Sequence, residues 1–247
     1  MTKPFLFAVC RPSGAILDSE KLEIPRLGGL NPETDFEIIE LGKPDSPEPE
    51  DLDLDLYAGV FISGSKYGFL DEQTGKPEDH RRIERRALRL GERLIERDQP
   101  TLGFCYGMHA LALAGGGTLT GEFAEDIYAP ELTLTEQGLS DPVTRGLPSS
   151  LRAFIGHKDS VGRLPKNTEV LLKADFCPVQ MMRIGNNIYA TQFHPEITNT
   201  AMHIRLEFYT GSYFDAAKAK ELWDYCDAAE VSGANQIISA FVERYRQ

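Results

Sequence analysis

The stretch Gln99–Thr118, QPTLGFCYGMHALALAGGGT, determines how the rest of the chain is arranged. Thr101–Phe104 has the pattern of a short buried strand and Met108–Ala114 that of an apolar helix, so Cys105 lies on the turn between them. Glycines two residues before and two residues after Cys105 relieve the crowding that such a tight turn imposes on side chains. The pattern is G-x-S-x-G with sulfur in place of oxygen.

The position of Cys105 favours a reactive thiolate. A thiol at a helix N-terminus faces unsatisfied backbone N–H groups and the positive end of the helix dipole, and both stabilise an anion. The alternative is a small buried core cysteine, the usual role of this residue in a globular protein. The five-residue pattern favours the nucleophile but leaves the core cysteine open, because short motifs recur by chance.

The length of the chain is sufficient for one α/β domain with a full core. We therefore expect a single domain over 1–247, with a helical C-terminal segment from about residue 199 to 247. Lys and Arg total 26 against 38 Asp and Glu, and the resulting net charge of -12 repels nucleic acid and anionic lipid. Neither nucleic acid nor membrane is expected as a partner, and no stretch approaches the roughly 20 apolar residues of a spanning helix.

The cysteines indicate a reducing compartment. Their spacing gives no disulfide framework, and the apolar run in the first ten residues, MTKPFLFAVC, is too short for a signal peptide. We therefore expect a cytoplasmic protein. The four cysteines are Cys10, Cys105, Cys177 and Cys226.

Strands and helices alternate before Cys105. Apolar runs predict buried strands at Pro4–Val9, Phe36–Leu41 and Tyr57–Ser63. Glu78–Arg97 predicts a long helix, because two acids open it, apolar residues recur on one face, and arginines alternate with glutamates on a salt-bridged outer face. This order is typical of a parallel sheet with right-handed crossovers.

Two segments in this half lack a clear pattern. Arg11–Leu30 contains Ile24-Pro25 and Gly28-Gly29, which limit any helix there to a few turns. Pro44–Asp55 mixes three prolines with six acids, and we interpret it as a solvated connection.

The pattern changes to strands after Gly115-Gly116-Gly117. Gly185-Asn186-Asn187 signals a hairpin, so we expect the second half of the sheet to be antiparallel or mixed. The expected strands are Ile127–Thr135, Leu151–Ile155, Thr168–Lys173, Val179–Ile184 and Ile188–Phe193. The expected helices are Ala201–Tyr209, one from a cap at Asp215 toward Ala228, and one with Ile237, Ile238, Phe241 and Tyr245 on a single face.

A base for the thiol is found in Gln192–Glu196, QFHPE. Pro195 keeps His194 in extended backbone, where residues two apart point the same way, so His194 and Glu196 can act as a pair. Glu196 would fix the tautomer of the imidazole and offset its charge after proton transfer from the thiol. Taken alone, a strand-end turn that merely exposes a His and a Glu explains the segment equally well.

The two motifs together resemble the class I glutamine amidotransferase family, whose triad is Cys, His and Glu. The resemblance runs from Ser63-Gly64-Ser65 to Glu196 and implies a flavodoxin-like α/β fold, a three-layer sandwich with a mostly parallel central sheet and an antiparallel extension. By position it implies Cys105 as nucleophile, His194 as acid and base, and Glu196 as the group that orients His194. In this family the Cys attacks the amide of glutamine, ammonia leaves, and water clears the γ-glutamyl thioester.

An oxyanion hole follows from the same resemblance. The tetrahedral oxyanion needs two donors aimed at it. The backbone N–H of Tyr106 follows the nucleophile directly, and Ser63-Gly64-Ser65 matches the glycine-rich loop of the family, with Gly64 as the second donor. An ordinary strand-end turn is the alternative for this loop.

Candidate substrate contacts also come from the resemblance. Residues 156–161, GHKDSV, resemble the family segment that lines the amino and carboxylate end of the substrate. Lys158 and Asp159 are therefore candidate contacts, together with Ser65 in the glycine-rich loop. A surface turn between strands explains residues 156–161 about as well.

His109 departs from the family, which commonly carries a Gln four residues after the nucleophile. We expect His109 to face the pocket and to favour a γ-glutamyl amide larger than glutamine, with packing in the core as the alternative. Cys105 and His109 could also begin a metal site, but no third and fourth ligands follow at recognisable spacing. Neither a metal nor a cofactor is expected.

These observations predict thiol-dependent hydrolysis of a small-molecule γ-glutamyl amide. One alternative is a glutaminase subunit that supplies ammonia to a separate synthetase, because the residues beyond Glu196 are too few for a synthetase domain. The other is a non-catalytic binding or regulatory module on the same fold. The departure from the family at His109 is the reason to retain this alternative. The chain resembles small family members such as the amidotransferase part of GMP synthase and γ-glutamyl peptidases.

Overall fold

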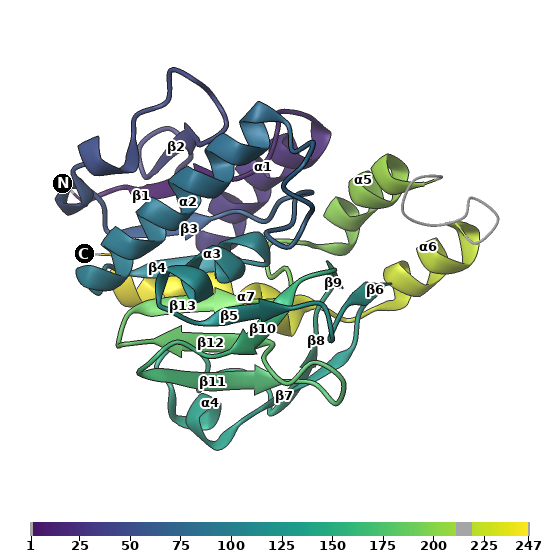
Figure 1. Cartoon of the computed structure of the whole chain (residues 1–247). Helices are drawn as coiled ribbons and strands as arrows, with labels where there is room; N and C mark the ends of the chain where they lie inside the picture. Colours follow the sequence, from purple (N-terminus) through teal and green to yellow (C-terminus); the bar gives the residue numbers. More distant parts are fainter. Residues whose placement is uncertain (1, 211–218, 247) are drawn as a thin grey trace.

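The computed structural model describes residues 2–210 and 219–246. In this part of the chain, nine strands form one sheet in the order β2-β1-β3-β4-β13-β12-β11-β7-β8 (Figure 1). The parallel part is β2 (Phe36–Glu40), β1 (Phe5–Val9), β3 (Gly59–Ile62), β4 (Thr101–Phe104) and β13 (Ile188–Thr191). The antiparallel extension is β12 (Met181–Ile184), β11 (Thr168–Lys173), β7 (Glu131–Leu134) and β8 (Ser150–Arg152). The fold class and the hairpin between β12 and β13 are confirmed.

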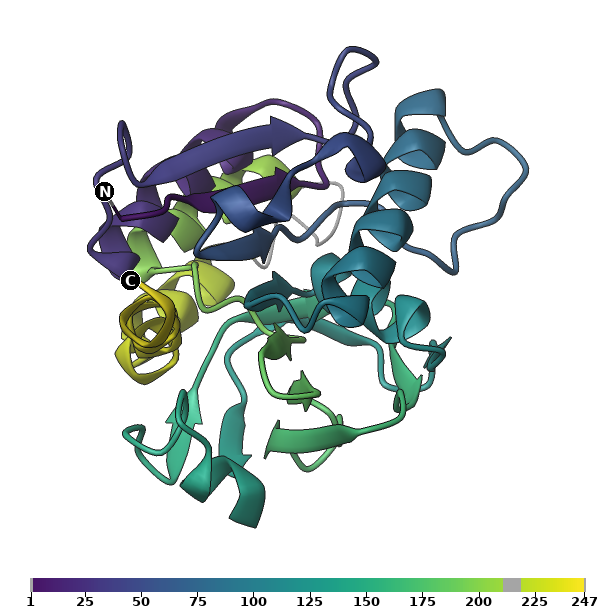
Figure 2. The same cartoon turned by 90° about the vertical axis from the view of Figure 1, so that its left-hand side faces the viewer.

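Helices cover both faces of the parallel part. Figure 2 shows α2 (Glu78–Glu96) on one side of the strands and α7 (Ser232–Tyr245) on the other. Along β1, Phe5 and Phe7 pack into the core beneath α7, whereas Leu6 packs into the core beneath α2. The unbroken apolar run of this strand therefore results from burial on both faces.

Two further helices complete these layers. The short helix after Cys105, α3 (Tyr106–Ala114), packs beside α2, and α1 (Ala15–Gly28) packs beside α7. The apolar face predicted for α7 is buried. No helix in the described ranges is both long enough and apolar enough to cross a membrane.

Another pair of helices lies at the right-hand edge of Figure 1. These helices, α5 (Asn199–Tyr209) and α6 (Ala219–Ala228), pack on each other through a small core that includes Met202, Leu206 and Cys226. The expected helix at Ala201–Tyr209 is confirmed. The cap expected at Asp215 falls outside the described residues.

Two of the expected strands are each divided in two. Ile127–Thr135 forms β6 (Glu125–Tyr128) and β7, separated at Pro130, because proline cannot donate a ladder hydrogen bond. Leu151–Ile155 contributes to β8 and to β9 (Ile155–His157), which pairs with β6 in a separate sheet. A second two-stranded sheet, β5 (Thr118–Thr120) with β10 (Ser160–Arg163), and the short α4 (Glu136–Ser140) were not expected.

Helix α1 has about four turns, within the limit that Arg11–Leu30 predicted. It runs for 14 residues and includes Pro25, which lies in its last turn. It ends at the expected glycine pair, where Gly29 has a φ of 60°. Burial of Leu17 and Ile24 in the core beneath α7 offsets the hydrogen bond that the proline removes.

The interpretation of Pro44–Asp55 as a solvated connection holds for five of its six acids, which are exposed, but parts of the segment are buried. The segment contains the short helix η1 (Pro49–Asp51), and Leu54 is buried. Arg86 of α2 donates hydrogen bonds to the carbonyls of Lys43 at 2.6 Å and Ser46 at 3.0 Å and is itself buried. A guanidinium has five donors. Arg86 uses its donors to hold the connection on α2, so it does not belong to the exposed outer face predicted for the arginines of this helix.

Candidate active site

Cys105 has a strained backbone at the turn from β4 to α3. Its φ is 44° and its ψ is -96°, a region that residues with a side chain rarely adopt. A Cβ atom on Gly103 would lie 2.9 Å from a backbone carbon of Gly107, and one on Gly107 would lie 2.6 Å from the carbonyl oxygen of Ile62. Both positions therefore require glycine, as the sequence predicted, and the turn directs the thiol out of the sheet.

His194 and Glu196 form a hydrogen-bonded pair. The Nδ1 atom of His194 lies 2.7 Å from the Oε1 atom of Glu196, whose side chain is fully buried. Burial lowers the pKa of His194, but the charge of Glu196 and hydrogen bonds with Cys105 and Glu196 outweigh this effect and raise it to about 9. The imidazole therefore holds a proton readily on the side of the thiol.

A buried charge network supports Glu196 from behind. The Nη2 atom of Arg205 lies 3.4 Å from Glu196 Oε1 and 2.9 Å from Glu20 Oε1, and Arg11 Nη2 lies 3.0 Å from the same Glu20 oxygen. Burial raises the pKa of Glu196, but the charge of His194 and the other favourable contacts lower it overall. Glu196 can therefore remain ionised in the interior.

Gln192 connects Cys105 with His109. The Nε2 atom of Gln192 donates to Cys105 Sγ at 3.7 Å, and its Oε1 atom lies 3.0 Å from His109 Nε2. His109 is 3% exposed, and burial lowers its pKa to about 4 despite the hydrogen bond with Gln192. The imidazole of His109 is therefore neutral and donates to Gln192 at neutral pH.

The two predicted oxyanion donors lie next to the catalytic candidates, Tyr106 beside Cys105 and Gly64 beside His194. Tyr106 is the first residue of α3, so its N–H lacks a partner within the helix. A Cβ atom on Gly64 would lie only 2.8 Å from His194 Cε1, so the Gly64 backbone passes directly beside the imidazole. The hydroxyl of Ser63 holds this loop, since it accepts from Cys10 N–H and donates to the Gly64 carbonyl, both at 2.8 Å.

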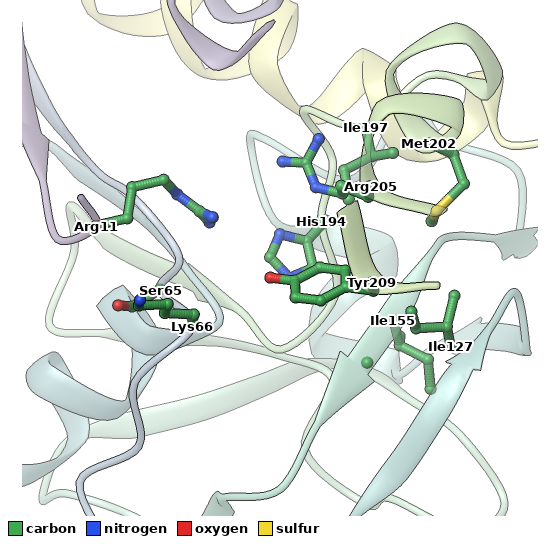
Figure 3. A pocket seen from close by; sticks show the side chains of 11 residues that line it. Arg11, Ser65, Lys66, Ile127, Ile155, His194, Ile197, Met202, Arg205 and Tyr209 are labelled. Carbon is green, nitrogen blue, oxygen red and sulfur yellow. The ribbon is translucent and has the colours of Figure 1, made fainter. Parts of the chain in front are cut away.

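Two hollows flank the site, one lined by Cys105 and the other by His194. The first, of about 380 Å³, has Cys105 and His109 in its lining. The second, of about 530 Å³, has His194, Arg11 and Arg205 around it, and Figure 3 shows these side chains facing the same space. We name them the thiol hollow and the arginine hollow. Both are lined by Ser65, Lys66 and Gly156.

The predicted substrate contacts all line the thiol hollow. Lys158 is exposed at its edge, whereas Asp159 is 5% exposed. The Oδ2 atom of Asp159 accepts a hydrogen bond from Leu70 N–H at 3.1 Å, so this carboxylate also holds the loop that carries Ser65 and Lys66. Two alternatives were considered for His109, a place in the pocket wall and packing in the core. The structure shows both, because His109 lines the hollow and is also hydrogen-bonded to Gln192 in the interior.

Several residues of the site were not identified from the sequence. Gln192 belongs to the QFHPE motif, and that motif is a signal that could have identified it. Arg11 and Glu20 come from Arg11–Leu30 and Arg205 comes from α5, and nothing in their local sequence indicates that they meet.

Comparison with known protein families identifies the family of this chain. A model described as glutamine amidotransferase class I matches residues 39–210. The chain belongs to the class I glutamine amidotransferase family. The match includes Gly64, Cys105, His194 and Glu196, so the family resemblance inferred from the two motifs is confirmed.

Relatives of this chain include GMP synthases. The chain is 33% identical over 159 residues to one subunit of the glutamine-hydrolyzing GMP synthase of Pyrococcus abyssi, covering 64% of this chain and 76% of that protein. It is 30% identical over 145 residues to the glutamine-hydrolyzing GMP synthase of Elusimicrobium minutum, covering 58% of this chain. The chain matches only 26% of the length of this second, longer relative.

Solved structures share the fold of this amidotransferase. A glutamine amidotransferase from Thermotoga maritima superposes with a TM-score of 0.77 and 20% identity, covering 98% of each chain. One from Methylobacillus flagellatus gives a TM-score of 0.69 and 17% identity, covering 100% of this chain and 97% of that chain.

Proposed function

We propose that this amidotransferase hydrolyses a γ-glutamyl amide through Cys105, His194 and Glu196. The observation that supports the proposal best is the 2.7 Å bond between His194 and Glu196 beside a thiol at the start of α3. The Cys105 sulfur attacks the amide carbon, and the backbone N–H groups of Gly64 and Tyr106 stabilise the oxyanion. His194 protonates the departing amine, and water activated by the same imidazole then releases glutamate from the thioester.

The thiol hollow suits the glutamyl part of such a substrate. Glutamate carries an ammonium and a carboxylate on its α-carbon, so the site needs one group of each charge. Asp159 and Lys158 both line this hollow together with Cys105. We assign the buried carboxylate of Asp159 to the ammonium and the exposed ammonium of Lys158 to the carboxylate.

The arginine hollow suits the amine part. Arg11, Lys66 and Arg205 place three cations in its lining, against two carboxylates, Glu20 and Glu196, that contact the arginines. In a protein with a net charge of -12, this local excess of positive charge favours an anionic group on the leaving amine. Apolar side chains also line this hollow, among them Ile127, Ile155 and Met202 (Figure 3). We infer that a γ-glutamyl dipeptide fits better than glutamine, whose leaving group is ammonia.

A substrate panel tests this proposal. Glutamine, γ-glutamylethylamide and γ-glutamylglycine are compared by kcat/KM, and we expect the dipeptide to be the best substrate. Lys66→Gln should lower kcat/KM for the dipeptide several-fold and leave γ-glutamylethylamide unchanged. Lys166→Gln, which removes an exposed lysine away from both hollows, should change neither value. If none of the three compounds is turned over, the result favours a non-catalytic binding module over an enzyme.

A glutaminase subunit for a separate synthetase is the second candidate. It is supported by the 33% identity to a protein whose name describes one subunit of a GMP synthase. In this case glutamine is the best substrate of the panel, and the chain should co-purify with a synthetase from native lysate. A preference for the dipeptide without a co-purifying synthetase contradicts it.

A further inference from the structure

Three potential metal ligands that are not part of the Cys-His-Glu group meet in the interior. Glu125 comes from β6, His157 from β9, and Cys177 from the connection between β11 and β12. His157 Nε2 lies 3.0 Å from Glu125 Oε2, and the ligand atoms of all three residues lie within 4.8 Å of one another. All three residues are buried. A thiol, an imidazole and a carboxylate are the three ligand types that zinc prefers in proteins.

Neighbouring groups orient these ligands. The Nδ1 atom of His157 lies 3.1 Å from the carbonyl oxygen of Asp159, which can only accept, so Nδ1 carries a proton and Nε2 points at Glu125. The hydroxyl of Tyr128 and the Nε2 atom of Gln180, at 3.1 Å, donate to the two oxygens of Glu125. Metal-binding histidines and carboxylates in proteins are held by such second partners.

Gln180 gives an independent indication of a missing partner. Its side chain is fully buried and contacts Glu125 through Nε2, but its Oε1 atom has no hydrogen-bond partner among the described residues. A buried amide oxygen without a partner is destabilising. Rotation of this amide would present Oε1 to a cation bound at Glu125, in exchange for the hydrogen bond that Nε2 now donates to Glu125.

We propose that Glu125, His157 and Cys177 bind a zinc-type divalent cation, with Gln180 Oε1 as the fourth ligand. A dication with one thiolate and one carboxylate has no net charge, so the site can be buried without an unpaired ion. The ligand atoms must move together by about 1 Å to reach zinc distances of about 2.0–2.3 Å. Coordination releases to solvent the thiol proton and the proton between His157 Nε2 and Glu125 Oε2.

The site would fix the segment that lines the thiol hollow. His157 directly precedes Lys158 and Asp159, so a cation that joins it to β6 and to Cys177 would hold this turn in place. The cation would act on structure, since none of its ligands belongs to the Cys105, His194 and Glu196 group. The metal site does not depend on the proposed reaction, because its test measures binding of the cation itself.

Cobalt provides the test, because a Co²⁺ ion bound to a thiolate has a charge-transfer absorption band. The full chain is treated with a chelator and titrated with Co²⁺, and zinc is then used to displace it. We expect one equivalent to bind with a thiolate band. Cys177→Ala should abolish the band, whereas Cys105→Ala and Cys226→Ala, which remove thiols elsewhere, should retain it. Gln180→Leu keeps the other three ligands and should weaken Co²⁺ binding by about 10–100-fold.

Other outcomes overturn the proposal. Absence of stoichiometric Co²⁺ binding, binding without a thiolate band, or a band that survives in Cys177→Ala each excludes this site. If Cys177→Ala does not fold, thermal unfolding of the wild-type chain with added metal ions provides the test. Its Tm should rise with Zn²⁺ and remain unchanged with Ca²⁺, which prefers oxygen ligands, and an equal response to both ions contradicts the proposal.

Discussion

The Oε1 atom of Gln192 lies 3.0 Å from the Nε2 atom of His109. The other end of the same amide donates to Cys105 Sγ at 3.7 Å. The imidazole of His109 and the amide of Gln192 therefore constrain each other, because the amide oxygen pairs only with a ring nitrogen that donates. A substitution at position 109 should change the thiol hollow even though the side chain is almost entirely buried.

We predict that His109→Gln shifts specificity toward glutamine. The flexible primary amide can turn toward a substrate amide, whereas the rigid imidazole is held by Gln192. The ratio of kcat/KM for glutamine to that for a γ-glutamyl dipeptide should rise about tenfold, the effect of about 1.4 kcal/mol from one hydrogen bond. An unchanged ratio in a folded variant would assign His109 to packing alone.

A second prediction concerns stability at acidic pH. Burial lowers the pKa of His109 to about 4, against an unfolded value of about 6.5, so the folded chain binds fewer protons in this window. The free energy of unfolding therefore falls as pH decreases from about 6.5 to 4, and this residue contributes about 3 kcal/mol of the loss. Above pH 6.5 its contribution is constant.

Urea denaturation of wild type and His109→Gln at pH 7 and pH 5 measures this effect. The difference between the two proteins should change by about 2 kcal/mol between these pH values. His194 has the opposite sign, because its raised pKa of about 9 gives stability that is full below about 6.5 and is lost as pH rises toward 9. Because wild type and His109→Gln both contain His194, its contribution cancels in the difference between their free energies of unfolding. Equal acid dependence of the two proteins would contradict the buried neutral His109.

The sequence predicted the parts of the site that depend on local chain geometry. The turn at Cys105 follows from the two flanking glycines, and the pairing of His194 with Glu196 follows from their spacing across a proline. The contact of Glu20 with Arg205 could not be predicted, because 185 residues separate them and only the packing of α1 against α5 brings them together.

The same distinction applies to the fold. Buried strands such as β4 were predicted with correct limits because their apolar runs have clear ends. The division at Pro130 was missed because the surrounding pattern of Ile127–Thr135 is otherwise continuous. The cluster of Glu125, His157 and Cys177 was also missed, since its spacing matches no metal motif and the folding of β6 and β9 creates it.

Reaction with iodoacetamide provides a third prediction. Limited treatment at neutral pH should modify Cys105 first, because it lines a hollow and lies at the start of α3. Burial raises the pKa of Cys10 to about 12 and those of Cys177 and Cys226 to about 11. Peptide mapping measures the order of modification. Labelling of any other cysteine at an equal rate would argue against an activated Cys105.

Losses of activity should follow the distance of each group from the reacting atoms. Cys105→Ala should abolish turnover and His194→Ala should nearly abolish it. Glu196→Gln should cost less, because it removes the charge but retains a group that can hydrogen-bond to the imidazole. Steady-state kcat/KM with the best substrate of the panel measures the order. Full activity of His194→Ala would rule out this triad.

The last prediction tests the close packing of α3 on β3. A Cβ atom on Gly107 would lie 2.6 Å from the carbonyl oxygen of Ile62, a backbone atom of a central strand that cannot move aside. Gly107→Ala must therefore shift α3, which carries the Tyr106 N–H at its start. We expect a loss of about 1–3 kcal/mol in the free energy of unfolding, the usual cost of overpacking, together with a lower kcat.

Gly146→Ala provides the matched control for this variant. A Cβ atom on Gly146 meets nothing within 4 Å, so its substitution should change stability by less than about 0.5 kcal/mol. Urea denaturation of both variants separates the steric effect at Gly107 from the general effect of replacing a glycine. If the two substitutions cost the same, the close approach of α3 to β3 is not what requires glycine at position 107. The position of the Tyr106 N–H would then depend on the strained backbone of Cys105 alone.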